Sequence, residues 1–364
     1  MSATSIDMLH YGYRPNGNET PELNGQIPAR ITEVHKELYK IICTHGESPA
    51  RLKGTFLHEC QQNGDFPAVG DFVRIQHNPQ GDALITALLP RRSKFSRPDF
   101  WGHKVGYAKT ILEQVVAANF DFVFILTSLN QDFSVPRVER YVTAAWQSGG
   151  TPVVILTKAD LCNDAEAQIR AIQRNAPGVD VLAVSAQTGA GLDRLLPYLQ
   201  PGKTLVFLGM SGVGKSSLVN ALAGQEVMPV QEIREDDSRG RHTTTHRQLL
   251  MLPQGVLVID TPGMRELGLW AVDDGLDETF ADVLELLGRC RFSDCQHKNE
   301  PGCAIRTAIE CGQLDPNRFK RYLALEKEAK YTNDKAAFMQ ARAEKNKSIS
   351  RYTRALKESE KHSN

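Results

Sequence analysis

The sequence predicts a multidomain protein with a small N-terminal β-barrel, a central α/β domain built on a parallel sheet, and a C-terminal helical domain that binds a metal. Three observations predict this. Short alternating apolar segments occupy residues 31–98, longer apolar segments alternate with amphipathic ones over 105–270, and cysteines cluster within 273–364. The length of 364 residues fits two or three domains of about 150 residues each.

Composition places the chain among ordinary globular proteins. Hydrophobic residues make up 41% of the chain and charged residues 24%. The 43 Lys and Arg balance 43 Asp and Glu, so the overall charge does not favour binding to nucleic acid or membrane. No segment approaches the roughly 18 apolar residues of a membrane span. Residues 1–30 lack the layout of a secretory signal and are expected to form a loosely ordered lead. We expect a cytoplasmic monomer without a membrane partner.

The barrel is predicted from three segments of residues 31–98. RLKGTFLHE, VGDFVRIQH and DALITALLP are expected to form short strands separated by turn residues. Such spacing suits a barrel of the oligonucleotide-binding (OB) type, and the segment RRSKFSR after it places an aromatic residue among cations. A small barrel without any nucleic-acid role would have the same pattern.

The α/β domain is predicted over residues 105–270. DFVFILT, PVVILT, VDVLAVS, KTLVFLG and GVLVID have the near-continuous apolar character of strands that are buried on both faces of a parallel sheet. The segments VPRVERYVTAAWQSG, DAEAQIRAIQRNA and GVGKSSLVNALAG between them have helical apolar spacing. Strands alternating with helices indicate a doubly wound α/β layout.

A phosphate-binding loop lies between the predicted strand KTLVFLG and the helix after it. Its sequence GMSGVGKSS matches the pattern G-x-x-x-x-G-K-[ST], in which glycines let backbone N–H groups surround phosphate oxygens. Lys215 is expected to contact the β- and γ-phosphates and Ser216 to bind Mg²⁺. The expected nucleotide-binding residues of the loop are Gly209, Met210, Ser211, Gly212, Val213, Gly214, Lys215, Ser216 and Ser217.

Two further segments are expected near the γ-phosphate. Asp260 ends the predicted strand LVID, where it can hold a water on Mg²⁺, and Gly263 can offer its N–H to the γ-phosphate. Upstream, DDSRGRHTTTH contains three consecutive threonines. Thr244 is expected to complete the magnesium shell while the γ-phosphate is present and to leave after hydrolysis. A plain polar loop is the alternative interpretation of the threonines.

The nucleotide base is expected to be read upstream of the phosphate loop. LTKAD and VSAQTG each follow a predicted strand and look like the guanine-reading elements of translation-factor-type GTPases. Asp160 would accept hydrogen bonds from the guanine N1–H and amine, a donor pair that adenine lacks. Lys158 would cover the base, and the backbone at Ser185 and Ala186 would meet guanine O6. Thr157 replaces the usual Asn, which predicts modest base affinity.

A metal site is predicted in the segment CRFSDCQHKNEPGC. It contains Cys290, Cys295, His297 and Cys303 in the spacing C-x₄-C-x-H-x₅-C, which matches a four-coordinate structural zinc site. Four protein ligands leave no position for a reactive water, so one Zn²⁺ would stabilise a segment with little core of its own. Free thiols beside a surface histidine are the alternative, and Cys311 is a spare thiol.

The order of these motifs is unusual. GTPases ordinarily have the phosphate loop first and the base-reading elements last, whereas here Thr157 and Ser185 precede Lys215 and Asp260, a circular permutation. This order, together with the barrel and the cysteine cluster, closely resembles the ribosome small-subunit-dependent GTPase A (RsgA) family from about Ile31 onwards. The resemblance implies an OB barrel, a permuted GTPase domain and a zinc-binding domain. It also implies docking on the small ribosomal subunit and its rRNA, stimulated hydrolysis of GTP to GDP, and action late in subunit maturation.

The sequence lacks the residue that usually orients the attacking water in Ras-like GTPases. Met264 occupies the place where Ras-like enzymes carry the glutamine that orients the attacking water, so intrinsic hydrolysis should be slow. His242 is the candidate for positioning water, because a neutral imidazole can polarise water near neutral pH. The alternative is an ordinary loop histidine. Arg239 and Arg241 are candidates for charge stabilisation or for rRNA contacts.

The C-terminal tail of the chain carries an excess of basic residues. Residues 317–364 contain thirteen Lys and Arg and six Asp and Glu, a net charge of +7. They form either a solvated helical face or a polyanion-binding surface.

Besides a subunit-dependent GTPase, the sequence allows a nucleotide-gated RNA-binding module with little hydrolysis, or a GTPase with a protein or membrane partner.

Overall fold

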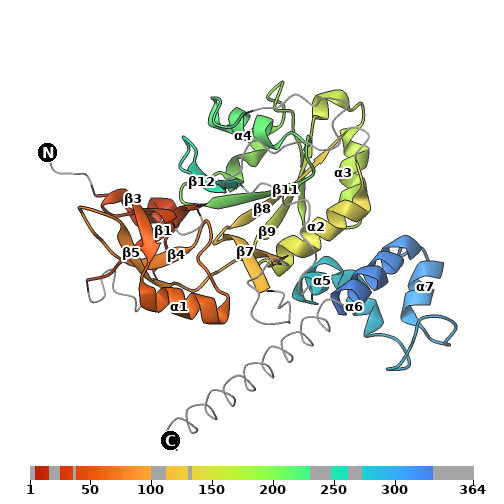
Figure 1. Cartoon of the computed structure of the whole chain (residues 1–364). Coiled ribbons are helices and arrows are strands. Elements are labelled where there is room, and N and C mark those ends of the chain that lie inside the picture. The colour runs from red at the N-terminus through yellow and green to blue at the C-terminus, as the bar shows by residue number, and fades with distance from the viewer. Residues whose placement is uncertain are drawn as a thin grey trace, which may run out of the picture.

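The computed structural model describes residues 5–15, 25–35, 38–99, 112–129, 133–229, 247–260 and 273–330. Figure 1 shows three parts along the chain: a barrel coloured red to orange, an α/β domain coloured yellow to green, and a helical part coloured blue. Within the described ranges, every helix is too short or too polar to span a bilayer.

The barrel has the strand order β1-β2-β3-β5-β4, and β4 pairs with β1 to close it. Its elements are β1 (Ile27–His35), β2 (Leu38–Cys43), β3 (Gly46–Leu52), α1 (Gly54–Asn63), β4 (Phe72–Gln76) and β5 (Ala83–Leu88). All neighbouring strands are antiparallel except β3 and β5, which are parallel. A five-stranded barrel with a helix between its third and fourth strands confirms the predicted OB type.

One strand prediction in the barrel is wrong. RLKGTFLHE does not form one strand, because its first residues end β3 and the rest begins α1. Phe56 and Cys60 lie one helical turn apart and both pack into the barrel core, so the apolar spacing here is helical. Gly64 ends the helix with φ of 74°, a left-handed conformation that glycine adopts without strain.

Part of the N-terminal segment that was predicted to be loosely ordered packs on the barrel. Residues Met8–Tyr11 form a 3₁₀ helix, and the side chain of Met8 is 4% exposed. The ring of Tyr13 lies 5.4 Å from that of Phe72 on the barrel. Apolar side chains in a segment rich in Gly, Pro and Asn therefore dock on the barrel, and β1 itself begins at Ile27.

The α/β sheet has the strand order β10-β9-β8-β11-β13-β12. Its strands are β8 (Phe122–Ser128), β9 (Thr151–Thr157), β10 (Asp180–Ala183), β11 (Thr204–Gly209), β12 (Gln248–Met251) and β13 (Leu257–Asp260). The first five in spatial order are parallel, and β12 pairs antiparallel with β13. Each of the five apolar segments that were predicted to be strands thus forms one strand, and the predicted parallel sheet is confirmed.

Helices cover both faces of this sheet, as Figure 1 shows. They are α2 (Val135–Gln147), α3 (Ala165–Gln173) and α4 (Lys215–Ala223). Alternate residues of β8 enter opposite cores: Val123 packs with α2 and α3, whereas Phe124 packs with α4. Burial on both faces explains why the strands are apolar without alternation.

The barrel and the α/β domain share one continuous sheet. Glu33 of β1 pairs with Gln248 of β12, and the fully buried Arg30 reinforces this junction. Its guanidinium donates to the Tyr11 carbonyl at 2.6 Å, the Thr204 hydroxyl at 3.0 Å and the Asn119 carbonyl at 2.9 Å. Burial, together with the nearby charge of Arg92, lowers the pKa of Arg30 to about 9.

A two-stranded ribbon and a helical part complete the described structure. They comprise β6 (Lys94–Asp99), β7 (Leu112–Ala118), α5 (Asp273–Thr279), α6 (Ala281–Leu287), α7 (Ala304–Glu310) and a helix over 316–330. The helices enclose their own core around Phe280. Helix α5 packs closely on α2, because a Cβ at Gly275 would lie 2.3 Å from the Thr143 carbonyl oxygen.

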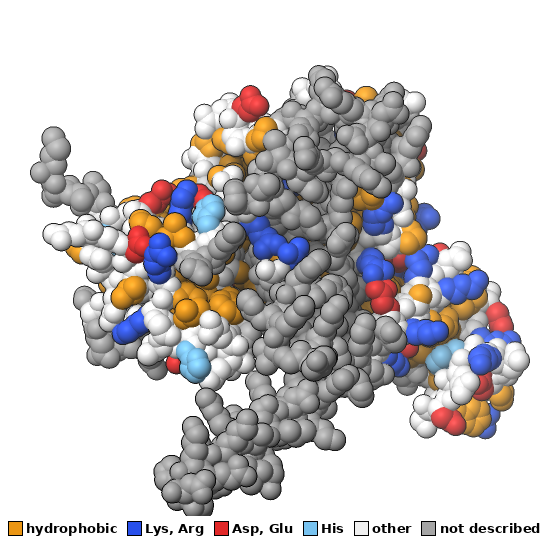
Figure 2. Space-filling view, in the orientation of Figure 1, with side chains coloured by type: hydrophobic (Ala, Val, Ile, Leu, Met, Phe, Trp, Pro, Cys, Tyr) orange, Lys and Arg blue, Asp and Glu red, His pale blue; other side chains and the backbone are white. Residues whose placement is uncertain are grey.

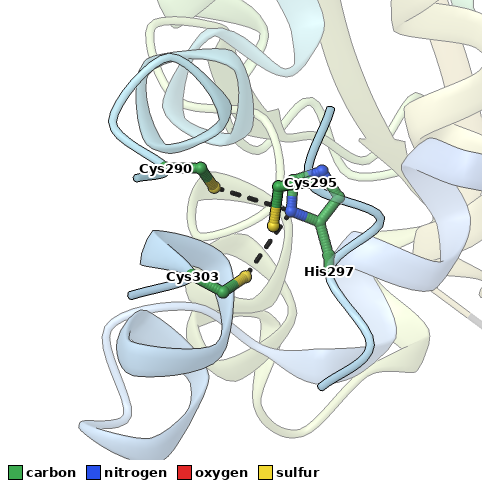
Figure 3. A group of neighbouring side chains, drawn as sticks. All are labelled: Cys290, Cys295, His297 and Cys303. Atoms are coloured by element: carbon green, nitrogen blue, oxygen red, sulfur yellow. Dashed lines mark hydrogen bonds between the residues drawn. The ribbon is translucent and has the colours of Figure 1, made fainter. Parts of the chain in front are cut away.

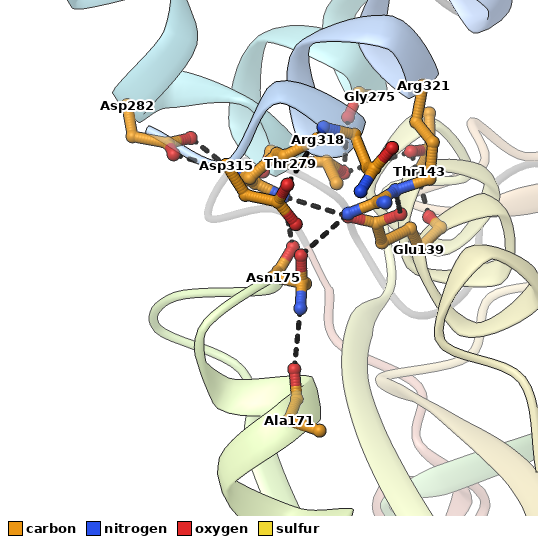
Figure 4. A network of polar contacts seen from close by, with 11 residues as sticks. Glu139, Thr143, Ala171, Asn175, Gly275, Thr279, Asp282, Asp315, Arg318 and Arg321 are labelled. Carbon is orange, nitrogen blue, oxygen red and sulfur yellow. Dashed lines mark hydrogen bonds and ion pairs between the residues drawn. The ribbon is translucent and has the colours of Figure 1, made fainter. Parts of the chain in front are cut away.

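A buried polar network fixes the helical part to the α/β domain (Figure 4). Arg318 is 2% exposed and donates to Glu139 of α2 at 3.0 Å, to Asp282 at 2.7 Å and to the carbonyl of Asn175 beyond α3. Arg321 donates to the Asn175 side chain at 2.7 Å and also contacts Glu139. The charges on both sides of the junction are paired, so their burial is compensated.

Candidate nucleotide site and metal centre

The phosphate loop connects β11 to α4 as the sequence predicts. Gly209 passes so close to β8 that a Cβ would lie 2.8 Å from the Leu126 carbonyl oxygen. Gly214 precedes α4 with φ of 98°, a left-handed conformation that disfavours other residues. Helix α4 begins at Lys215, so its free N–H groups and positive dipole end face the loop.

Lys215 and Asp260 meet at the carboxyl edge of the sheet. Strands β11 and β13 are parallel neighbours, and the Lys215 Nζ contacts Oδ1 of Asp260. The Asp260 side chain is fully buried, and its Oδ2 has no hydrogen-bond partner among the described residues. A buried carboxylate oxygen without a donor is suited to a water held on a cation, so Asp260 has the chemistry of a magnesium partner.

The first of the two predicted base-reading elements contacts the phosphate loop directly. Thr157 ends β9, is 4% exposed, and donates its hydroxyl hydrogen to the Val213 carbonyl at 2.6 Å. Lys158 follows with φ of 58° and ψ of 41°, a left-handed conformation that lysine rarely adopts. Backbone strain of this kind is typical of functional sites. Asp160 therefore lies on a segment fixed to the loop that carries Lys215.

The two predicted base-reading elements are also hydrogen-bonded to each other. The Ala159 N–H donates to the Val184 carbonyl at 3.1 Å, which joins TKAD to VSAQTG. Ser185 is fully buried, and its hydroxyl accepts the Thr188 N–H at 3.2 Å. Gly191, which the sequence analysis missed, lets this turn pass β10, since a Cβ there would lie 2.3 Å from the Ala183 carbonyl oxygen.

The four predicted metal ligands converge in the helical part (Figure 3). The ligand atoms of Cys290, Cys295, His297 and Cys303 all lie within 4.8 Å of one another. His297 Nδ1 lies 3.6 Å from the Cys290 sulfur and 3.5 Å from the Cys303 sulfur. Tetrahedral zinc bonds of about 2.3 Å to sulfur and about 2.0 Å to nitrogen separate these atoms by about 3.5 Å. The cluster fits a metal ion with Nδ1 as the nitrogen ligand.

Two features around the cluster were not predicted. The Glu300 carboxylate accepts the N–H groups of Gln296, Lys298 and Asn299 at 3.1, 2.9 and 3.0 Å, and its pKa is lowered by its own N–H and these donors. These bonds hold the turn in which His297 adopts φ of 60°. Desolvation and the neighbouring thiols raise the pKa of Cys295 to about 11.

Glu300 is expected to control metal retention. Replacing it with Ala removes the acceptor that shapes the turn of His297, so we expect metal affinity to fall about 10- to 100-fold. Competition with a chromophoric chelator measures this. Glu310, an exposed partner of Arg306 in the same domain, provides the control, and Glu310→Ala should leave metal release unchanged. Equal release from both variants would contradict a role for Glu300.

Several predicted residues lie outside the described residues. They are His242 and Thr244 of the threonine segment, its neighbours Arg239 and Arg241, and Gly263 and Met264 after β13. The structure brings together the other predicted elements: the phosphate loop, Asp260, TKAD and VSAQTG. Because these elements meet at one edge of the sheet despite their permuted order, strand neighbours rather than chain order form the site.

Comparisons with known proteins identify this arrangement. The RsgA GTPase family model matches residues 88–270. A protein of Lactiplantibacillus plantarum named Small ribosomal subunit biogenesis GTPase RsgA 2 is 44% identical over 90% of both chains. The chain belongs to the RsgA GTPase family. It is accordingly a GTP hydrolase with a circularly permuted domain.

Further relatives agree with the RsgA assignment. A protein of Opitutus terrae named Small ribosomal subunit biogenesis GTPase RsgA is 44% identical over 88% of both chains. The crystal structure of YjeQ from Thermotoga maritima is 26% identical, covers 84% of this chain and 98% of its own, and superposes with a TM-score of 0.62. YloQ, described as a circularly permuted GTPase, superposes with a TM-score of 0.59 at 26% identity, covering 84% and 96% of the two chains.

An ABC transporter model also matches residues 192–353. That range contains the phosphate loop, which both classes of nucleotide-binding protein carry. The RsgA model covers in addition the strands that bear TKAD and VSAQTG. The second match is therefore explained by the loop and does not change the RsgA assignment.

Thr157 gives a test of how the RsgA site is held together. Thr157→Val keeps the side-chain shape but leaves the Val213 carbonyl without its buried donor, which costs about 1–2 kcal/mol. We expect GDP and GTP to bind about 5- to 30-fold more weakly, since 1.4 kcal/mol is a factor of about ten. Titration with a fluorescent nucleotide measures this, and Thr157→Ser should bind like the wild type. Unchanged affinity of the Val variant would show that the contact does not support the site.

Proposed function

We propose that this GTPase acts in the biogenesis of the small ribosomal subunit, hydrolysing GTP to GDP and phosphate when it docks on the subunit and its rRNA. The observation that carries the proposal is that relatives named for this role match the chain over about nine-tenths of its length. That length includes the barrel, the permuted domain and the metal segment. The OB barrel also supports it, because such barrels bind nucleic acids.

The nucleotide would lie along the carboxyl edge of the parallel sheet. Asp160 reads the guanine, with Lys158, Ser185 and Ala186 around the base. The phosphate loop holds the triphosphate through backbone N–H groups and Lys215. Ser216, Thr244 and Asp260 would hold Mg²⁺, which offsets the charge of the phosphate oxygens when bound. Gly263 completes the γ-phosphate contacts in this proposal.

The remaining proposals concern the metal, the assembly state and the location. One Zn²⁺ at Cys290, Cys295, His297 and Cys303 would have a structural role, because four protein ligands complete a tetrahedral shell. We propose a cytoplasmic monomer. The exposed side chains of Arg289 and the neighbouring Arg291 and Lys298 would then meet rRNA phosphates.

Turnover of GTP with and without purified small subunits tests the proposal, with ATP as the comparison nucleotide. We expect subunits to stimulate GTP hydrolysis and ATP to be a poor substrate. Met264 favours the alternative of a nucleotide-gated RNA-binding module, for which GTP-dependent binding to subunits would occur without turnover. No GTP-dependent binding to subunits would contradict both functions.

His242 is our candidate for positioning the attacking water. In His242→Ala, subunit-stimulated turnover should fall about 100-fold, the lower end for a lost general acid–base group. Binding of GTP should be retained, because the residue does not belong to the phosphate or base contacts. His246→Ala, four residues away in the same segment, is the matched control and should keep its turnover. Full stimulated turnover by the His242 variant would remove this residue from the mechanism.

A further inference from the structure

Phe292 is an exposed aromatic side chain inside the metal segment. It lies between the ligands Cys290 and Cys295, and 43% of its surface is exposed. Within the metal segment 290–303, all of which the structure describes, it is the only large hydrophobic side chain that is exposed to this degree. The neighbouring core does not require it, since that core is formed by the helices around Phe280.

The backbone around Phe292 is held in place on both sides. Arg291 donates its N–H to the Gly302 carbonyl at 3.1 Å, and Cys295 donates its N–H to the Phe292 carbonyl at 3.3 Å. Arg291 also packs closely on Gly302, where an added Cβ would lie 3.0 Å from the Arg291 Cβ. A backbone held in this way needs little ordering when a partner covers the Phe292 side chain.

One cation lies over the face of this ring. The Arg291 guanidinium carbon lies 5.5 Å from the centroid of the Phe292 ring, and Lys298 is exposed on the same segment. The Glu300 carboxylate of the same segment already accepts hydrogen bonds from three backbone N–H groups. Figure 2 shows blue cationic side chains beside orange hydrophobic ones at this end of the molecule, away from the barrel.

We propose that Phe292 stacks on an unpaired base of rRNA, while Arg291 and Lys298 contact the adjoining phosphates. This rests on the proposed function and specifies the kind of RNA element that the metal segment meets. Exposed aromatic rings beside cations suit unpaired bases, whose faces are free, whereas paired bases are already stacked. An apolar pocket on a protein partner would accept an aliphatic side chain in place of Phe292 equally well. Binding that requires an aromatic side chain at this position therefore distinguishes an RNA base from a protein pocket.

Three variants, Phe292→Ala, Phe292→Leu and Phe292→Tyr, test the proposal on purified small subunits with a non-hydrolysable GTP analogue. Stacking contributes about 1–3 kcal/mol per base, so Ala and Leu should each weaken binding about 5- to 160-fold. Both should also restore the chemical reactivity of at least one unpaired rRNA base that the wild type protects. The Tyr variant should keep the affinity and the protection.

Controls separate folding from recognition. Leu323→Ala removes another exposed side chain, 42% exposed, from the same part of the molecule and should change neither readout. Metal content should be equal in all variants. Wild-type affinity of Phe292→Leu, or full base protection by Phe292→Ala, would overturn the stacking proposal while subunit-stimulated hydrolysis still supports the proposed function. Absence of wild-type binding to subunits would contradict both.

Discussion

Asp160→Asn should change the base preference of this enzyme from guanine to xanthine. In the proposed site the Asp160 carboxylate accepts hydrogen bonds from the guanine N1–H and amine. The NH₂ group of an Asn side chain would instead face the guanine amine, and neither group could accept from the other. Xanthine has a carbonyl oxygen in place of that amine, so it can accept from Asn. Asp160 is exposed in this structure, and the proposed base would cover it. Selection by hydrogen bonds to polar groups covered in this way reaches on the order of 10⁴-fold, and we expect GTP affinity to fall towards this extent while XTP affinity rises. Competition between GTP, XTP and ATP measures the preference.

Asp164 supplies the matched control for this variant. Its carboxylate caps α3 by accepting the Ala167 N–H at 3.0 Å, and Asn caps helices equally well. Asp164→Asn should therefore keep the guanine preference and the stability. A variant Asp160→Asn that still prefers GTP over XTP would contradict the assignment of base reading to TKAD.

Lys215→Met should abolish most hydrolysis and destabilise the nucleotide-free protein at the same time. Hydrolysis should fall on the order of 10³-fold, because the cation proposed to contact the β- and γ-phosphates is lost. Stability should fall by about 2 kcal/mol, since the fully buried Asp260 loses the charge that compensates it. Urea unfolding without nucleotide and steady-state turnover measure the two effects.

A double variant separates the two consequences. In Lys215→Met with Asp260→Asn, the buried charge is removed, so the stability should return towards that of the wild type. Hydrolysis should stay low, because neither the phosphate contact nor the magnesium partner is restored. If the double variant is less stable than Lys215→Met alone, the ion pair does not account for the stability of this edge.

The fold was largely predictable because its strands and helices have different apolar periods. The five apolar segments of the α/β domain are buried on both faces, and their length and flanking turns identify them as strands. Helix α1 was missed because RLKGTFLHE is too short for its helical spacing to stand out from alternation. Strand β12 was also missed, since QLLM gains its strand conformation from β13 and β1.

The site was predictable where its chemistry is local in sequence. The phosphate loop, TKAD and the cysteine cluster are short motifs whose residues act together, and the structure places the cluster within one small region. The Thr157–Val213 bond was not predictable, since its partners are 56 residues apart and meet only through strand order. Glu300 was missed for a similar reason: its role depends on a turn conformation that spacing alone does not reveal.

A crystal structure with a non-hydrolysable GTP analogue and Mg²⁺ tests the central claim most directly. The account predicts one nucleotide along the carboxyl edge of the sheet, with guanine against Asp160, the phosphates against Lys215 and the loop around it, and Asp260 near the metal. Guanine bound away from Asp160 while the phosphates occupy the loop would contradict the claim that upstream and downstream segments form a single permuted site.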